Sequence, residues 1–210
     1  MREKWWFPVV YMFVMTAFFS SIVIGFSQFT SDRVEANEDL AFEKAILTVL
    51  PDMLGAGDSR LELHRKFTEL VGQPDANSGG ACTLSREGRI VAYALPISGQ
   101  GFWAPIKGVI GIKADRRTIT GIAFYEQNET PGLGAQITKI GFTSQFQGKV
   151  ISSTGKPLNI KRPSDVLGKS DVHAVTGATQ TSTRLEKIIN DALKNWLSEF
   201  SQADGEGRTQ

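Results

Sequence analysis

The sequence predicts an α+β protein, in which a single N-terminal transmembrane helix precedes one domain with helices packed on a mainly antiparallel sheet. Three observations support this prediction. An uncharged apolar stretch lies near the N-terminus, alternating β-branched segments fill the middle third, and an apolar stripe marks the last long helix. The chain has 210 residues, of which 41% are hydrophobic, and this is enough for one domain and an accessory segment.

The uncharged stretch is WWFPVVYMFVMTAFFSSIVIGFSQFTS, residues 5–31, which contains no Asp, Glu, Lys, Arg or His. A helix needs about 20 apolar residues to cross a bilayer core, and this stretch supplies them. Trp5, Trp6 and Tyr11 stand near its start, where interfacial aromatic residues belong. Residues 1–31 are therefore predicted to be an N-terminal tail and a transmembrane helix. A cleaved signal peptide is the alternative, although the run is long for one and no A-x-A site follows it.

The charges that flank this stretch predict its orientation. Arg2 and Lys4 precede it, and several acids follow within ten residues. Because positive charge favours the cytoplasmic side, the N-terminus is expected in the cytoplasm and the C-terminal domain on the extracytoplasmic side.

The composition excludes several classes of function. The net charge is +1 and no basic run could follow a phosphate backbone, so we expect no nucleic-acid partner. Cys82 is the single cysteine, so an intrachain disulfide is impossible. With only two histidines, His64 and His173, far apart in the sequence, no zinc or haem site is expected.

Residues 32–80 are predicted to form a helical connector. The spacing of apolar residues between Leu40 and Leu50 predicts a helix that Asn37 would cap and Pro51 would end. A second segment, residues 61–72, has no clear type. Glycine and polar residues at 72–80 indicate a surface loop.

The following domain is predicted at residues 81–200. Alternation and β-branched residues predict strands at 89–97, 108–114 and 118–126, with a hairpin turn at 115–117. Residues 148–173 are predicted to be loop, with a short strand near Val150. An amphipathic helix then follows, and the polar tail at 201–210 is expected to be disordered.

The mouth of this last helix, HAVTGATQTSTRLEKIIN, contains more hydroxyls than a cap requires. A helix N-terminus has unpaired N–H groups and partial positive charge, so it stabilises an anion such as phosphate. Gly177 and Ala178 allow a ligand to approach the backbone closely. Two readings stay open on these grounds: a phosphate-bearing ligand, or a richly capped helix in which Glu186 completes something like a capping box.

The stretch VTGATQT, residues 175–181, resembles the flavinylation motif of the FMN-binding domain family. This domain occurs in the C subunit of the sodium-translocating NADH:quinone reductase (Nqr) and in the G subunit of the Rnf electron-transport complex. The resemblance implies that FMN is covalently attached through a phosphoester to Thr179, in a turn lined by Thr176, Gly177, Ala178 and Thr181.

One position departs from the family motif. The family has an acid six residues before the modified threonine, where this chain has His173, and Asp171 lies two residues further upstream. The family's acid is associated with recognition by the flavin transferase, so this departure bears on whether the chain is modified.

Two further stretches resemble the same family. NETPGLGAQI, residues 128–137, contains the family's E-T-P-G-L-G, and Pro131-Gly132 suits the centre of a type II turn. The resemblance implies that the residues of this stretch that surround the isoalloxazine and ribityl groups are Glu129, Thr130, Leu133 and Gly134. GQGFW, residues 99–103, resembles a segment in which Trp103 and Phe102 could wall the flavin, although both could equally be core residues.

These resemblances imply a membrane-anchored electron-transfer subunit that relays electrons within an ion-translocating redox complex of the Rnf or Nqr type in a bacterial inner membrane. The implied partners are integral-membrane and flavin or iron–sulfur subunits, with a flavin transferase for maturation. No independent substrate turnover is expected of such a carrier. The alternative is a non-redox anchored binding or assembly protein that holds a phosphate ligand reversibly.

Overall fold

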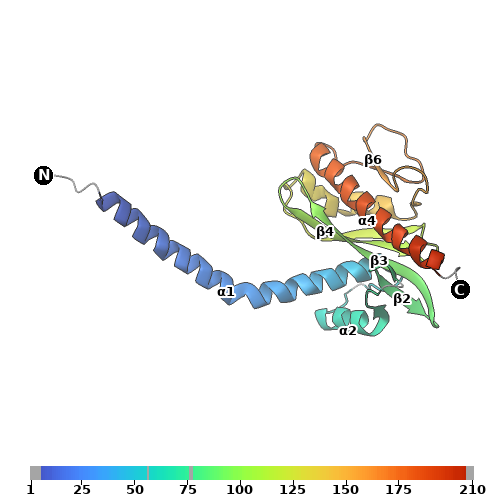
Figure 1. Cartoon of the computed structure of the whole chain (residues 1–210), viewed down its shortest axis with the longest axis horizontal. Helices are drawn as coiled ribbons and strands as arrows, with labels where there is room; N and C mark the ends of the chain where they lie inside the picture. The colour runs from blue at the N-terminus through green and yellow to red at the C-terminus, as the bar shows by residue number, and fades with distance from the viewer. Residues whose placement is uncertain (1–5, 56, 76–77, 207–210) are drawn as a thin grey trace. The chain divides into compact units, whose positions relative to one another are not determined.

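The computed structural model describes residues 6–55, 57–75 and 78–206, and it confirms the predicted fold class. The chain divides into two compact units, Met1–Asp39 and Leu40–Gln210. The second unit contains an antiparallel sheet with helices on both faces (Figure 1).

The first helix, α1 (Phe7–Val49), is longer than the sequence predicted. Asn37 does not cap a separate helix, so that prediction is wrong: its side-chain amide donates to the carbonyl oxygen of Arg33 at 2.7 Å, inside α1. The reason is that neither glycine nor proline interrupts the chain between Gly25 and Pro51, so nothing stops the helix.

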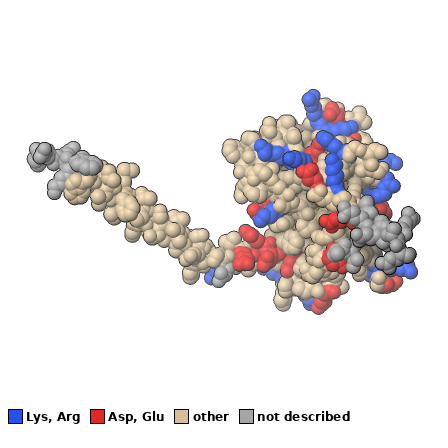
Figure 2. Space-filling view, viewed as in Figure 1, with Lys and Arg blue, Asp and Glu red and all other residues tan. Residues whose placement is uncertain are grey.

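Within α1, the segment Phe7–Ser31 is long and apolar enough to cross a membrane, with a mean hydropathy of 2.1 over 25 residues. Figure 2 shows this part of α1 without acidic or basic side chains, and acidic side chains follow it. The finding agrees with membrane anchoring by length and composition.

The segment of unclear type is a helix, α2 (Arg60–Leu70). Ser59 caps it, because its hydroxyl oxygen accepts from the backbone N–H of Glu62 at 3.3 Å. Leu63 and Phe67 are buried, and they join the C-terminal end of α1 in one apolar cluster. His64 lies on the outer side of α2, and its Nδ1 is 2.8 Å from a carboxylate oxygen of Glu43.

The sheet has five strands in the order β1-β2-β3-β4-β5, and every neighbouring pair is antiparallel. Its members are β1 (Val71–Gly72), β2 (Cys82–Arg86), β3 (Arg89–Gln100), β4 (Pro105–Lys113) and β5 (Ile119–Glu126). The three predicted strands are confirmed as β3, β4 and β5. The predicted hairpin turn also forms, with Arg116 at a φ of 56° and Asp115 Oδ1 accepting from the N–H of Arg117 at 2.9 Å.

Alternation along β3 places its side chains on two separate cores. Tyr93, Leu95 and Ile97 join the cluster that contains the last helix, α4 (Thr179–Glu206). The intervening Ala92 and Ala94 join the cluster formed with the end of α1 and with α2. The sheet is thus covered by α4 on one face and by the end of α1 and α2 on the other.

Between β5 and α4 the chain forms short elements: η2 (Gly134–Thr138), α3 (Ile140–Thr143), η3 (Ser144–Phe146), β6 (Asn159–Lys161) and β7 (Asp171–His173). Residue Val150, where a short strand was predicted, makes an isolated bridge with Thr118. Asn190 of α4 fixes the loop before β6, because its side chain bonds both the N–H and the carbonyl oxygen of Leu158, at 2.9 and 2.8 Å. Helix α4 runs to Glu206, and residues 207–210 of the predicted disordered tail lie outside the described residues.

Candidate functional site

Helix α4 begins at Thr179, directly after the turn of small residues. Gly177 has a φ of 76°, which a residue with a side chain rarely adopts. The first intrahelical bond runs from the N–H of Ser182 to the carbonyl oxygen of Ala178, at 3.0 Å. The N–H groups of residues 179–181 precede this bond, so they are the unpaired donors that the sequence predicted at this end of the helix.

The hydroxyls in the first turn have different surroundings. The hydroxyl of Ser182 caps the turn, because it accepts from the N–H of Val175 at 3.3 Å. Thr181 is buried, and its hydroxyl donates to a carboxylate oxygen of Glu129 at 2.7 Å. Thr179 is exposed, and its hydroxyl makes no hydrogen bond to the described part of the chain. The turn is therefore capped without Thr179, whose hydroxyl is left accessible.

A pocket of about 210 Å³ lies beside Thr179. Every residue predicted for the site lines it except Thr176 and Trp103, and Phe102 and Gln180 line it as well. Thr176 lines a neighbouring pocket of about 360 Å³, which Thr179 also borders. The structure thus brings together two motifs that lie about fifty residues apart in the sequence, on the two sides of one pocket.

Glu129 links three segments of this pocket. It is only 5% exposed. One carboxylate oxygen accepts from the backbone N–H groups of Phe102 and Trp103, at 2.7 and 3.3 Å. The other accepts from the hydroxyl of Thr181. A single buried carboxylate therefore holds the loop after β3 and the start of α4 together.

Two glycines leave room for this carboxylate. A Cβ atom at Gly101 would lie 2.5 Å from Oε1 of Glu129, and one at Gly134 would lie 2.8 Å from its Oε2. Any larger residue at either position would push Glu129 away from its partners. The turn between these segments forms as predicted, with a φ of 79° at Gly132 and a bond of 3.1 Å from the N–H of Leu133 to the carbonyl oxygen of Thr130.

The aromatic pair after β3 lies at the surface and does not belong to a core. Trp103 is 65% exposed, and its Nε1 donates to the hydroxyl of Thr130 at 3.1 Å. Phe102 is 43% exposed, contacts Trp103 edge-on at 4.9 Å between ring centroids, and lines the pocket. The core alternative considered for both is therefore wrong. Phe102 was not among the site residues predicted from the sequence, although the Phe-Trp pair was the signal that could have identified it.

Asp171 does not take the position of the missing motif acid. Its carboxylate is buried and is bound by Lys161 at 2.8 Å, by the side chain of Asn159 at 2.9 Å and by the N–H of Gly168 at 2.7 Å. The hydrogen bond from Lys161 is the main reason why the pKa of Asp171 is lowered to about 2. His173 is half-buried, and its Nε2 bonds the carbonyl oxygen of Asp165 at 3.0 Å. Asp171 is therefore structural, tying β6 to β7.

We expect Asp171→Asn to destabilise the protein at neutral pH and to matter little near pH 2. The folded-state pKa of Asp171 is depressed, so its stabilisation is fully present above the unfolded value near 3.8 and disappears as the pH falls through about 2. Thermal unfolding of both proteins between pH 2 and pH 7 tests this. The gap between their melting temperatures should close on acidification, and a gap that stays constant would contradict the expectation.

Comparison with known proteins agrees with this geometry. Residues 101–194 match the family model of the FMN-binding domain. The chain is 34% identical over 183 residues to the C subunit of the Na⁺-translocating NADH-quinone reductase of Neisseria meningitidis serogroup B, covering 86% of this chain and 58% of that protein. The corresponding protein of Chlamydia pneumoniae is 47% identical over 75 residues, covering 36% of this chain and 23% of that protein. The chain thus spans less than two thirds of the length of these curated relatives.

Solved structures share the fold. The C subunit of the same type of reductase from Parabacteroides distasonis superposes with a TM-score of 0.68 at 25% identity, covering 80% of this chain and 96% of that one. NqrC of Shewanella oneidensis also has a TM-score of 0.68, at 19% identity, and covers 81% and 99% of the two chains. The site motifs, the match over residues 101–194 and the shared fold together identify an FMN-binding domain, in a chain that belongs with the NqrC-like proteins.

Proposed function

We propose that this chain is a membrane-anchored electron-transfer subunit that carries FMN through a phosphoester on Thr179 and relays electrons within an ion-translocating redox complex of the Nqr or Rnf type. One observation carries the proposal. The exposed hydroxyl of Thr179, which no described residue bonds, stands at the N-terminus of α4 beside a pocket built by both family motifs.

The start of α4 suits a phosphodiester. Such a link keeps one negative charge, and the unpaired N–H groups of the first turn together with the helix dipole stabilise it. Gly177 carries no side chain that could block access, and a Cβ atom there would lie 3.1 Å from Leu133 Cδ2. The residues present therefore fit a phosphate attached at Thr179.

The pocket suits part of a flat ring. Its volume of about 210 Å³ is below the range of roughly 300–1,000 Å³ that is typical for ligands which are fully enclosed. Phe102 and Leu133 contribute apolar surface, and Thr130 and Glu129 contribute polar groups. The site would enclose one part of an isoalloxazine and leave the rest at the surface, where another redox centre can approach.

FMN, when bound, supplies the reversible acceptance and release of electrons. The chain supplies retention, orientation and partial exclusion of water. A covalent link to Thr179 would prevent loss of the cofactor on the extracytoplasmic side, where we propose that the domain lies. Anchoring by Phe7–Ser31 would restrict the carrier to the plane of the membrane, beside integral-membrane and flavin or iron–sulfur partners.

Maturation would require a flavin transferase, because a threonine hydroxyl is a poor nucleophile without activation. With FAD as donor, the bond from Thr179 Oγ1 to the phosphorus of the FMN half forms as the pyrophosphate bond breaks. AMP leaves, and the hydroxyl proton passes to a base of the transferase. His173 stands where the family has its recognition acid, so a transferase for this chain would have to accept histidine there.

The test is direct. The protein is produced in a host with an active flavin transferase, denatured, separated on a gel and viewed under ultraviolet light. We expect retained fluorescence, and a mass increase of one FMN less one water on the peptide that contains Thr179. A colourless protein under these conditions would reject the proposal.

The replacement of the motif acid by His173 favours a second candidate, in which the chain is a non-redox binding or assembly protein that holds a phosphate ligand reversibly. This candidate predicts that FMN or inorganic phosphate binds to the native protein and is lost completely on denaturation. The gel experiment therefore separates the two.

We propose the following division of the chain within this function. Residues 1–31 would anchor it, residues 32–80 would connect, residues 81–200 would bind FMN and residues 201–210 would be a tail. The apolar contacts of the connector with Ala92 and Ala94 support a firm attachment of its later part to the sheet.

A further inference from the structure

Strand β3 continues past the end of its neighbour β2. The last residue of β3 that pairs with β2 is Ala94, opposite Cys82. The strand then runs to Gln100, paired on one side only, with β4. The second half of β3 therefore has an open edge in the described structure, although β3 lies in the middle of the strand order.

The phase of hydrogen bonding shows which groups lie on this edge. The N–H of Ala114 donates to the carbonyl oxygen of Val91 at 3.0 Å, so the odd-numbered residues of β3 bond to β4. Even-numbered residues face the other way, toward β2 as far as Ala94 and toward the open edge beyond it. Ser98 and Gln100 each present an N–H and a carbonyl there, and Pro96 presents a carbonyl alone.

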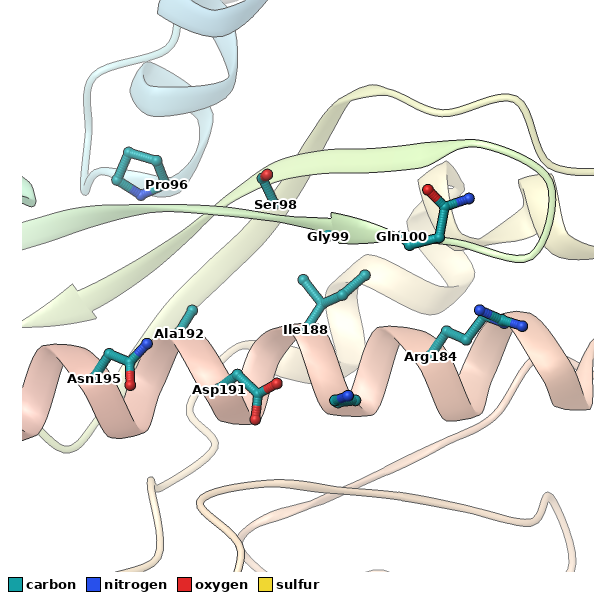
Figure 3. Close-up of a pocket in the computed structure, with 10 residues that line it drawn as sticks. Pro96, Ser98, Gly99, Gln100, Arg184, Ile188, Asp191, Ala192 and Asn195 are labelled. Atoms are coloured by element: carbon teal, nitrogen blue, oxygen red, sulfur yellow. The ribbon is translucent and has the colours of Figure 1, made fainter.

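A groove of about 560 Å³ lies between this edge and α4. Figure 3 shows its two walls, with Ser98 and Gln100 on the strand and Ile188 directed from α4 toward the strand. The two walls meet closely at Gly99, where a Cβ atom would lie 2.6 Å from Cγ1 of Ile188. The groove is thus an open channel that runs beside unpaired backbone groups.

The α4 wall of the groove is charged. Arg184, Lys187 and Asp191 line it, and all three are exposed. None of the three makes an ion pair with any residue that the structure describes. Two cations against one acid leave this wall with an excess of positive charge, which complements a carboxylate.

We propose that this groove binds an extended segment of a partner polypeptide by β-strand addition. The backbone of the segment would bond the N–H and carbonyl groups of Ser98 and Gln100, and an acidic side chain of the segment would pair with Arg184 and Lys187. Pro96 would end the pairing, because it has no N–H to offer.

The chain's own C-terminus cannot fill this groove. Helix α4 extends eleven residues beyond Asn195, roughly 16 Å, before it ends at Glu206. The four residues that follow span at most about 14 Å when extended, which is too short for a return to Ser98. A second copy of the chain fits less well, because antiparallel pairing about Ser98 would set a proline against Gln100 and leave its carbonyl without a donor.

The groove adjoins the site described above. The guanidinium of Arg184 lies 6.0 Å from the centroid of the Phe102 ring, and Phe102 lines the pocket beside Thr179. A segment held at Arg184 would therefore bring the protein it belongs to next to the exposed part of the flavin. This consequence for electron transfer depends on the proposed function, whereas binding in the groove does not.

Photo-crosslinking in native membranes tests the proposal. The full chain carries Gln100→p-benzoylphenylalanine and is irradiated in membranes that contain its complex. We expect one adduct with a different polypeptide, mapped by mass spectrometry to an extended segment with an acidic residue. Adding Ser98→Pro removes one edge N–H without touching the β4 ladder and should reduce this adduct about tenfold, as should Lys187→Glu.

Two matched controls should retain the adduct: Ser98→Ala, which keeps the N–H, and Lys194→Glu, which makes the same charge change at an exposed position of α4 outside the groove. An adduct of twice the mass of the chain, no adduct, or equal loss with Ser98→Ala or Lys194→Glu would overturn the proposal. Gel fluorescence of the same samples reports the attached flavin independently, so failure of strand addition and failure of flavin attachment are distinguishable.

Discussion

Thr179→Val is expected to remove the attached flavin completely while leaving the fold intact. Valine has nearly the shape of threonine but no hydroxyl, so no phosphoester can form. Because Thr179 is exposed and its hydroxyl bonds no described residue, the stability should change by only about 0.5 kcal/mol. In-gel fluorescence should fall to background, and the melting temperature should stay within about 2 °C of the wild type.

The neighbouring hydroxyls provide controls. Thr183→Val changes another exposed threonine of the first turn and should keep full fluorescence. Thr181→Val should also keep the flavin but lower stability by about 1–3 kcal/mol, because it leaves a carboxylate oxygen of Glu129 without its bond from the hydroxyl. If Thr179→Val stayed fluorescent while Thr181→Val went dark, the site of attachment would be Thr181 instead.

The sequence predicted the strands well because their signals are local. Alternation and turn residues specify β3, β4, β5 and the turn at Asp115 without reference to the rest of the fold. The two site motifs were also readable, since glycine and proline fix the turn at Gly132 and small residues open the start of α4.

Features that depend on distant contacts could not be read in this way. Nothing local distinguishes the hydroxyl of Thr181 from that of Thr179, and only the fold reveals that one is bound by Glu129 and the other is accessible. The open edge of β3 depends on where β2 ends, which the sequence of β3 does not contain. The false cap at Asn37 shows the opposite case, in which a local signal was overridden because the helix had no reason to stop.

Glu129→Ala is expected to weaken both the fold and the site. The change leaves the N–H groups of Phe102 and Trp103 and the hydroxyl of Thr181 without their acceptor in a buried position. Each buried group that loses its partner costs about 1–3 kcal/mol, and partial rehydration through the cavity reduces the sum, so we expect a loss of roughly 3 kcal/mol. For a chain of this size the melting temperature should fall by about 10 °C.

Glu129→Gln separates the hydrogen bonds of this residue from its charge. The amide oxygen can still accept from the N–H of Phe102, and the amide nitrogen can donate to the hydroxyl of Thr181, which then acts as acceptor. Most of the stability should therefore return, with a melting temperature within about 4 °C of the wild type.

The charge itself should still affect the cofactor in Glu129→Gln. A negative carboxylate at the pocket disfavours the addition of electrons to a flavin held there, so its removal should raise the midpoint potential. Redox titration of the flavin-loaded wild type and Glu129→Gln measures this directly. An unchanged potential, with the attached flavin retained and the stability restored, would show that Glu129 positions the walls of the pocket and lies too far from the ring to influence it.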